Sequence, residues 1–300
     1  MQKEIIRNDV NKKTVVALGK FESLHRGHLA LFSCAAKTAK EIDASPVVYM
    51  IKDPASSDII LFPEKKALAK EYGIDAFYTD ELTDEYKKIM PEEFVKNILK
   101  NSLSACHVVV GYNFAFGYKR MGTISVLKEL CRKYDIGVTV VDCVFAPVGS
   151  ENIPVSTSDI RKHLFNGDVD RANKLLGRNF SVSGVVTNGK HLGSEIGFPT
   201  ANLVFAEKII PLKKGVYATK TLVDKVLMDS ITNVGVNPTV EKADGFVRVE
   251  THILNYHEEL YGKEIKVEFL LRLRDEKTFS SVDDLKKQLA EDVKKLTALI

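Results

Sequence analysis

The alternation of apolar and polar positions divides the chain into two parts with different periods. In the first part, short apolar runs alternate with stretches in which apolar residues recur at helical spacing. The runs that we predict to be buried parallel strands are 14–18, 46–51, 106–110 and 138–141. The helical stretches between them lie at about 29–39, 64–72, 91–99 and 125–134. This alternation predicts a doubly wound, Rossmann-like α/β sheet that binds its ligands at the carboxyl ends of the strands.

Beyond Arg178-Asn179-Phe180 the helical pattern gives way to closely spaced strands. The predicted strands are 181–186, 215–223, 226–231, 247–254 and 265–271. Closely spaced strands followed by one helix predict a small closed antiparallel β-barrel with a terminal helix. The apolar stripe that we expect to pack that helix on the barrel is Leu285, Leu289, Val293 and Leu296. We therefore predict two domains, 1–178 and 179–300.

Composition narrows the classes of protein without identifying one. The chain has 300 residues, 45% hydrophobic content and a formal net charge of +3, which is too mild to argue for nucleic acid. The four cysteines form no CxxC pair or zinc-ligand spacing, so we expect reduced thiols. Neither a signal-peptide run nor a bilayer-length apolar stretch is visible. We expect a cytoplasmic protein with small-molecule substrates and neither nucleic-acid nor membrane partners; oligomeric state is left open.

The first candidate for chemistry follows the first strand, in the segment Gly19-Lys20-Phe21-Glu22-Ser23-Leu24-His25-Arg26-Gly27-His28. His25 and His28 flank the start of a helix, and Gly27 between them keeps the approach open. Two imidazoles beside free amides of a helix start suit the charge of a polyphosphate. A His-x-Gly-His segment can also form an ordinary loop, but its place between a strand and a helix favours a functional site.

Two further segments of the first part carry polar groups at places suited to ligands. Asn113 lies in an aromatic, glycine-punctuated loop after the third strand, and such rings can stack on planar ligands or simply cap the core. The hydroxyl residues Ser156, Thr157 and Ser158 occupy capping positions of a later helix, with Arg161 one turn in. On the residues alone, a capped helix with a surface arginine explains this segment equally well.

The second part contains a loop with three glycines ahead of a Phe-Pro-Thr-Ala-Asn corner. Glycines let backbone amides approach a phosphate closely, and a proline stiffens the turn that follows. Thr200 and Asn202 supply neutral oxygens, which Mg²⁺ accepts when substrate phosphates provide the remaining ligands. In strand 247–254, period two places Glu250 on the face opposite Val249 and Ile253. Glu250 could act there as a general base, or it could be an exposed glutamate paired with Arg248.

Together these segments resemble the bifunctional prokaryotic FAD synthetases, which join a riboflavin kinase to an FMN adenylyltransferase. The resemblance covers nearly the whole chain and keeps the order of the motifs. It implies an N-terminal nucleotidyltransferase domain in which His25 and His28 stabilise the reacting α-phosphate of ATP and the departing pyrophosphate. The residues that it implies for binding of nucleotide or flavin there are Gly19, Phe21, Asn113, Ser156, Thr157, Ser158 and Arg161.

For the second part, the resemblance implies a riboflavin kinase barrel. Thr200 and Asn202 would bind the magnesium of MgATP, and Glu250 would accept the proton of the riboflavin 5′-hydroxyl. The residues implied for ATP binding are Gly189, Gly193, Gly197, Pro199, Thr200 and Asn202. The resemblance thus implies Mg²⁺ with ATP, and riboflavin, FMN and FAD as substrates or products.

The chain departs from the family pattern at several positions. Glu22 and Ser23 stand where the family has Asp-Gly, Lys52-Asp53-Pro54-Ala55 stands where it has a Pro-His-Pro segment, and Ser194 replaces a basic residue. These departures motivate a second hypothesis, a riboflavin kinase whose N-terminal domain binds nucleotide or flavin without catalysis. A third hypothesis is adenylyl transfer to another phosphorylated substrate.

Overall fold

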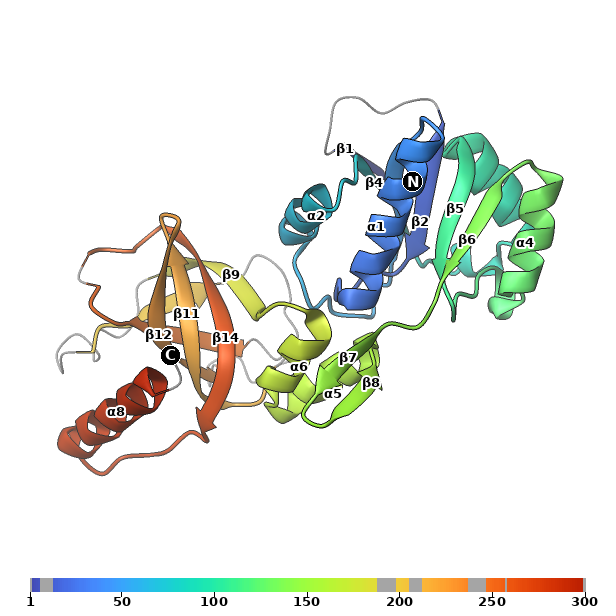
Figure 1. Ribbon diagram of the computed structural model, residues 1–300. Coiled ribbons are helices and arrows are strands. Elements are labelled where there is room, and N and C mark those ends of the chain that lie inside the picture. The colour runs from blue at the N-terminus through green and yellow to red at the C-terminus, as the bar shows by residue number, and fades with distance from the viewer. Residues whose placement is uncertain are drawn as a thin grey trace. The chain divides into compact units, whose positions relative to one another are not determined.

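In the computed structural model the chain forms two compact units, shown in Figure 1. The residues that the structure describes are 2–5, 13–187, 198–204, 212–236, 247–256 and 258–298. The first unit comprises Met1–Ser57 with Phe62–Ser156, and the second comprises Asp58–Leu61 with Thr157–Ile300. Among helices within these described ranges, none is long and apolar enough to cross a membrane.

A six-stranded sheet in the order β1-β4-β3-β2-β5-β6 forms the first unit. The strands are β1 (Gln2–Ile5), β2 (Thr14–Gly19), β3 (Ser45–Lys52), β4 (Ala76–Glu81), β5 (Ala105–Gly111) and β6 (Gly137–Val141). β2 to β6 are parallel, and β1 runs antiparallel to β4 at one edge. The four predicted parallel strands are confirmed as β2, β3, β5 and β6, whereas β1 and β4 were not expected.

Helices connect the parallel strands, as the alternating pattern predicted. They are α1 (Arg26–Glu41), α2 (Phe62–Glu71), η1 (Tyr86–Lys88), α3 (Pro91–Glu93), η2 (Phe94–Ser102), η3 (Tyr118–Arg120) and α4 (Ile124–Lys133). α1 packs on β2, β3 and β5. The predicted helix 91–99 is found as α3 continued by the π-helix η2. A short hairpin, β7 (Phe145–Val148) with β8 (Glu151–Pro154), ends the unit.

The second unit begins with two helices, α5 (Thr157–Asn166) and α6 (Val169–Leu176), and continues into a closed six-stranded barrel. Its strands are β9 (Phe180–Thr187), β10 (Ala201–Val204), β11 (Gly215–Val223), β12 (Val226–Val236), β13 (Val247–Ile253) and β14 (Glu264–Arg274). Asp224 and Lys225 have φ of 48° and 70° in the β11–β12 turn, which is the conformation of a tight hairpin. The antiparallel barrel is therefore confirmed.

Hydroxyl side chains gather inside the barrel, which the sequence did not predict. The buried members are Thr219, Thr221, Ser230, Thr232 and Thr251. Each hydroxyl lies within hydrogen-bonding distance of at least one other, as in the 2.9 Å bond from Thr232 to Thr251. Because the groups satisfy one another, their burial does not leave an orphaned donor or acceptor.

The terminal helix α8 (Val282–Thr297) packs on the outer face of the barrel, and Ser281 caps it by accepting the backbone N–H of Asp284. Leu296 joins an apolar cluster with Val216, Ala218 and Ile231, with Val293 alongside. The expected stripe is only part of the interface, because Leu285 and Leu289 remain half-exposed. The other buried positions of α8 are polar, Gln288 and Asp292.

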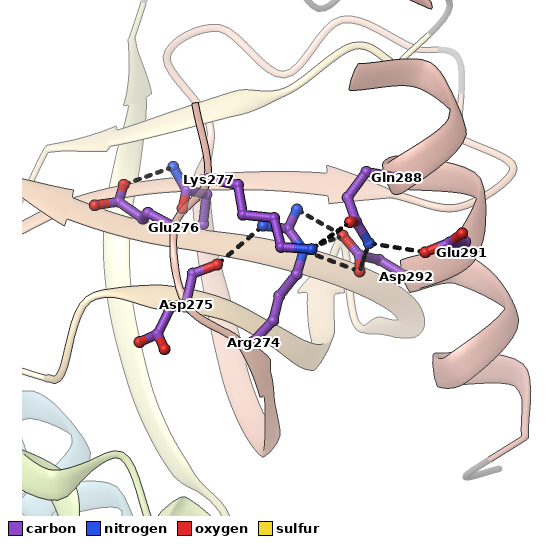
Figure 2. Close-up of polar contacts among 8 residues, drawn as sticks. Arg274, Asp275, Glu276, Lys277, Gln288, Glu291 and Asp292 are labelled. Atoms are coloured by element: carbon purple, nitrogen blue, oxygen red, sulfur yellow. Dashed lines mark hydrogen bonds and ion pairs between the residues drawn. The ribbon is translucent and has the colours of Figure 1, made fainter. Parts of the chain in front are cut away.

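Figure 2 shows how these polar residues attach α8 to the barrel. Arg274, at the end of β14, donates from Nε and Nη2 to the carboxylate of Asp292 at 2.8–3.1 Å. Gln288 donates to Asp292 and accepts from Lys277 Nζ at 2.9 Å. The side chain of Asp292 is fully buried and that of Arg274 is only 10% exposed, so solvent screens this pair little.

We predict that Asp292→Ala destabilises the barrel unit by about 3–5 kcal/mol, since it leaves the buried guanidinium of Arg274 without its partner. Lys174→Ala is the control, because it removes a half-exposed ion pair with Asp170 in the same unit and should cost at most about 0.5 kcal/mol. Urea denaturation measures both. An unchanged midpoint for Asp292→Ala would mean that the apolar contacts of α8 suffice.

Candidate active sites

The paired histidines lie at the start of α1, where β2 ends. His25 is the N-cap residue, and its Nδ1 accepts the backbone N–H of His28 at 3.3 Å. The two rings stack with centroids 3.7 Å apart and an interplanar angle of 13°. Because Nδ1 accepts a hydrogen bond, the neutral ring of His25 carries its proton on Nε2. That N–H is a donor suited to a phosphate oxygen.

Phe21 packs its ring against the ring of His28. Its ring is fully buried and lies 5.1 Å from both His28 and Phe32. A Cβ on Gly19 would come within 3.0 Å of the Phe21 ring, so glycine permits this close packing. Phe21 and Leu24 have φ of 50° and 44°, in the left-handed region that costs a non-glycine residue energy. The backbone is thus strained at two positions of the loop that leads to the histidines.

Asn113 follows β5, which pairs directly with β2 in the sheet. The loops after β2 and β5 therefore begin at the same edge, and Asn113 is exposed there. The rings of Phe114 and Phe116 stack at 5.6 Å, and Phe116 also packs on Phe94 of η2. The aromatic residues thus anchor the loop to the core and leave the amide of Asn113 available to a ligand.

Glu22 and Asp53, which both depart from the family pattern, lie near the ammonium group of Lys20. Lys20 Nζ lies 3.2 Å from Asp53 Oδ2 and 4.0 Å from Glu22 Oε1. A hydrogen bond from the Ala55 N–H, together with Lys20, lowers the pKa of the Asp53 carboxyl. Ser23 is fully buried, and the left-handed backbone falls at its neighbours rather than at Ser23.

The remaining candidates of the first part lie around the start of α5. Ser156 directly precedes the helix, Thr157 and Ser158 open it, and Arg161 lies one turn in. Ser158 is exposed, and the other three are partly buried. In the second part, Gly189, Gly193 and Gly197 lie outside the described residues.

On the outer face of the barrel, β10, β13 and β12 bring three polar residues into one row. Asn202 of β10 and Asn233 of β12 are the direct cross-strand partners of Glu250 on β13. Directly opposed Cβ atoms lie about 5 Å apart, so both amides flank the carboxylate. Val249 and Ile253 face the interior, whereas the Glu250 side chain is 25% exposed. Arg248 Nη1 lies 3.4 Å from Glu250 Oε1, so the expected ion pair also exists.

Two further hydrogen bonds lie beside this row. His252 Nδ1 lies 2.8 Å from the carbonyl oxygen of Pro199, next to Thr200. Burial lowers the pKa of His252, and the hydrogen bond with Pro199 offsets part of that shift. At the other end, Asn233 Nδ2 donates to Glu276 Oε1 at 3.4 Å. The sequence signals for His252 were its place two residues after Glu250, on the same face of β13, and the resemblance of this Val-Glu-Thr-His segment to the family pattern.

The donor set fits a magnesium ion bound together with substrate phosphates. Thr200 is exposed one residue before β10, and Asn202 is partly exposed within it. Both side chains offer neutral oxygens, and Asn202 is the cross-strand partner of Glu250; oxygens of this kind are the hard ligands that Mg²⁺ prefers. A site of this kind leaves coordination positions open for phosphate and water.

Comparison with known proteins agrees with this geometry. The sequence model of the FAD synthetase family matches residues 7–158, and that of the riboflavin kinase family matches residues 176–300. The first unit therefore belongs to the FAD synthetase class, and the barrel belongs to the riboflavin kinase class.

Relatives resemble the chain over almost its full length. A bifunctional riboflavin kinase/FMN adenylyltransferase from Listeria monocytogenes is 33% identical over 298 residues, covering 95% of this chain and 91% of that protein. Those from Buchnera aphidicola subsp. Acyrthosiphon pisum and Escherichia coli are each 30% identical, over 295 and 288 residues, covering 95% and 93% of this chain and 93% and 90% of those proteins. This chain belongs to the family of bifunctional riboflavin kinase/FMN adenylyltransferases.

A solved structure shares the whole arrangement of elements. A crystal structure described as a macrolide-efflux protein from Streptococcus pneumoniae superposes with a TM-score of 0.83 at 27% identity. The match covers 97% of this chain and 96% of that one.

The His25 cap generates a test of its structural part. We predict that His25→Ala destabilises the first unit by about 1 kcal/mol, since the N–H of His28 loses its acceptor. His25→Asn should stay within a few tenths of a kcal/mol of the natural protein, because asparagine is a good N-cap. Urea denaturation of both variants makes the comparison, and equal losses would show that the cap contributes nothing specific.

Proposed function

We propose that the chain phosphorylates riboflavin to FMN with MgATP and then adenylylates FMN to FAD with release of pyrophosphate. The observation that carries the kinase assignment is the cross-strand pairing of Asn202 with Glu250 on the outer face of the barrel. This pairing places a neutral oxygen ligand beside a carboxylate base. In addition, both family matches occur in one chain, in the family's order.

In the kinase step, Glu250 accepts the proton of the riboflavin 5′-hydroxyl while the hydroxyl oxygen attacks the γ-phosphorus of ATP, the bond from that phosphorus to the bridging β–γ oxygen breaks, and ADP leaves. Thr200 and Asn202 would hold the magnesium, which offsets charge on the transferring phosphoryl group. Arg248 lies beside Glu250 and places a positive charge next to its carboxylate.

In the adenylyl step, the FMN phosphate attacks the α-phosphorus of ATP and pyrophosphate leaves. His25 and His28 donate hydrogen bonds to the phosphates, and the N-terminus of α1 adds its partial positive charge. Asn113 would orient the nucleotide or flavin from the neighbouring loop. For Ser156, Thr157, Ser158 and Arg161, the resemblance to the family implies binding of the β- and γ-phosphates.

The relatives favour a catalytic first domain over one that only binds. Each is named for both activities, and the match to this chain covers at least 90% of its length. The domain boundary at 178/179 stays part of the proposal. We also infer that the protein works in the cytoplasm on small molecules, without nucleic-acid or membrane partners. The mild net charge of +3 supports this inference.

The decisive experiment incubates the protein with riboflavin and MgATP and separates the flavins by chromatography. We expect FMN to appear first and FAD to follow. FMN without FAD, also when FMN is supplied directly, would favour the kinase-only alternative. Absence of any FMN would remove the kinase assignment.

Single substitutions should separate the two activities. We predict that Glu250→Gln lowers kcat for riboflavin phosphorylation by roughly 10²–10⁴-fold, since the amide cannot accept the proton. FAD formation from supplied FMN should be unchanged in that variant.

His28→Ala should give the opposite result. We expect a loss of about 10²-fold or more in FAD formation from FMN, since a donor to the phosphates is removed. FMN formation from riboflavin should persist, and each variant therefore serves as the control for the other. A fall of both activities in one variant would contradict the assignment of sites to units.

A further inference from the structure

We propose that His252 is a positioning residue of the kinase site, which holds the corner that carries Thr200 in the geometry needed for MgATP. The inference rests on the proposed kinase function and deepens it. Neither the motif pattern nor the family match assigns this role. The argument depends on one hydrogen bond, on the register of β10 with β13, and on the surroundings of the ring.

The hydrogen bond has a fixed direction. A carbonyl oxygen only accepts, so His252 must donate from Nδ1 to Pro199 at 2.8 Å. The neutral ring with its proton on Nδ1 makes this bond, and so does the imidazolium. The ring of Phe198 lies 5.2 Å from the imidazole at an interplanar angle of 59°. His252 therefore contacts both residues that precede Thr200.

The register explains what the bond achieves. The β10–β13 ladder begins with Ala201 opposite Thr251 and continues with Asn202 opposite Glu250. Thr200 lies just before the first rung, where a strand end would otherwise fray. His252 fixes the backbone at Pro199, and the first rung of the ladder fixes it at Ala201. Thr200 lies between these two fixed residues. Its hydroxyl thereby keeps a fixed place relative to Asn202 and Glu250.

Packing alone does not explain a histidine at this position. The ring is largely buried, and burying a polar ring costs free energy that an apolar side chain of similar size would avoid. The polar partner of the ring among the described residues is the backbone oxygen next to Thr200. Preorganising a ligand-bearing corner is a use of the bond that repays this cost, because it lowers the ordering needed when MgATP binds.

The test compares His252→Ala with His252→Asn. Asparagine can place its Nδ2 near the position of the histidine Nδ1 and restore the donor, whereas alanine cannot. Riboflavin phosphorylation is measured against MgATP and against free Mg²⁺. We expect alanine to raise the KM for MgATP and the half-saturating Mg²⁺ concentration roughly tenfold, the effect of one lost hydrogen bond. Asparagine should stay within about threefold of the natural protein for both quantities.

Two controls separate positioning from general stability. Val204→Ala alters the exposed far end of β10 and should leave both quantities unchanged. FAD formation from supplied FMN should be unchanged in all variants, and urea denaturation reports stability. Unchanged KM and Mg²⁺ values in His252→Ala would overturn the inference. Equal losses in the alanine and asparagine variants, in parallel with their stability, would also overturn it.

The outcomes also separate this inference from the function on which it rests. An active natural protein with an unaffected His252→Ala variant removes the inference alone. A natural protein that forms no FMN removes the proposed kinase and the inference with it.

Discussion

The pairing of β10 with β13 is the constraint on which the kinase site depends. β10 has only four residues, yet its register sets Asn202 against Glu250 and leaves Thr200 just before the first rung. A register shift of one residue would turn Asn202 toward the interior and Leu203 outward. This shift is unfavourable because it would expose the buried Leu203 side chain to water. Burial of Ala201 and Leu203 thus fixes the register, and the register fixes the chemistry.

The proposed phosphate sites of the two units are built from different structural elements. Each must gather groups that bind phosphates at one place on a rigid frame. In the first unit, parallel strands end at one edge, and the N-terminus of α1 adds backbone donors to His25 and His28. In the second, cross-strand neighbours on the outside of a barrel provide side-chain oxygens. The proposed site of the first unit relies on backbone amides and imidazoles, whereas that of the second relies on Thr200, Asn202 and Glu250.

Much of this arrangement could be predicted from the sequence, because apolar periodicity records which faces are buried. The parallel strands, the barrel and the face of Glu250 followed from it. β10 was missed because a four-residue strand leaves too short a pattern. The α8 contacts were only partly predicted, since Gln288 and Asp292 are polar residues on a buried face. The role of His252 depends on a bond to a backbone oxygen 53 positions away, which no local pattern records.

The hydroxyl network inside the barrel has a consequence for how the family can change. Replacing one member, such as Thr232, by an apolar residue would leave Thr219 and Thr251 with one hydroxyl partner each instead of two, and so with hydrogen-bonding capacity that is no longer used. Replacing all five together by aliphatic residues would leave none stranded. Substitutions in this interior should therefore be inherited as a group, so that homologous barrels carry either the hydroxyl set or an aliphatic set and rarely a mixture.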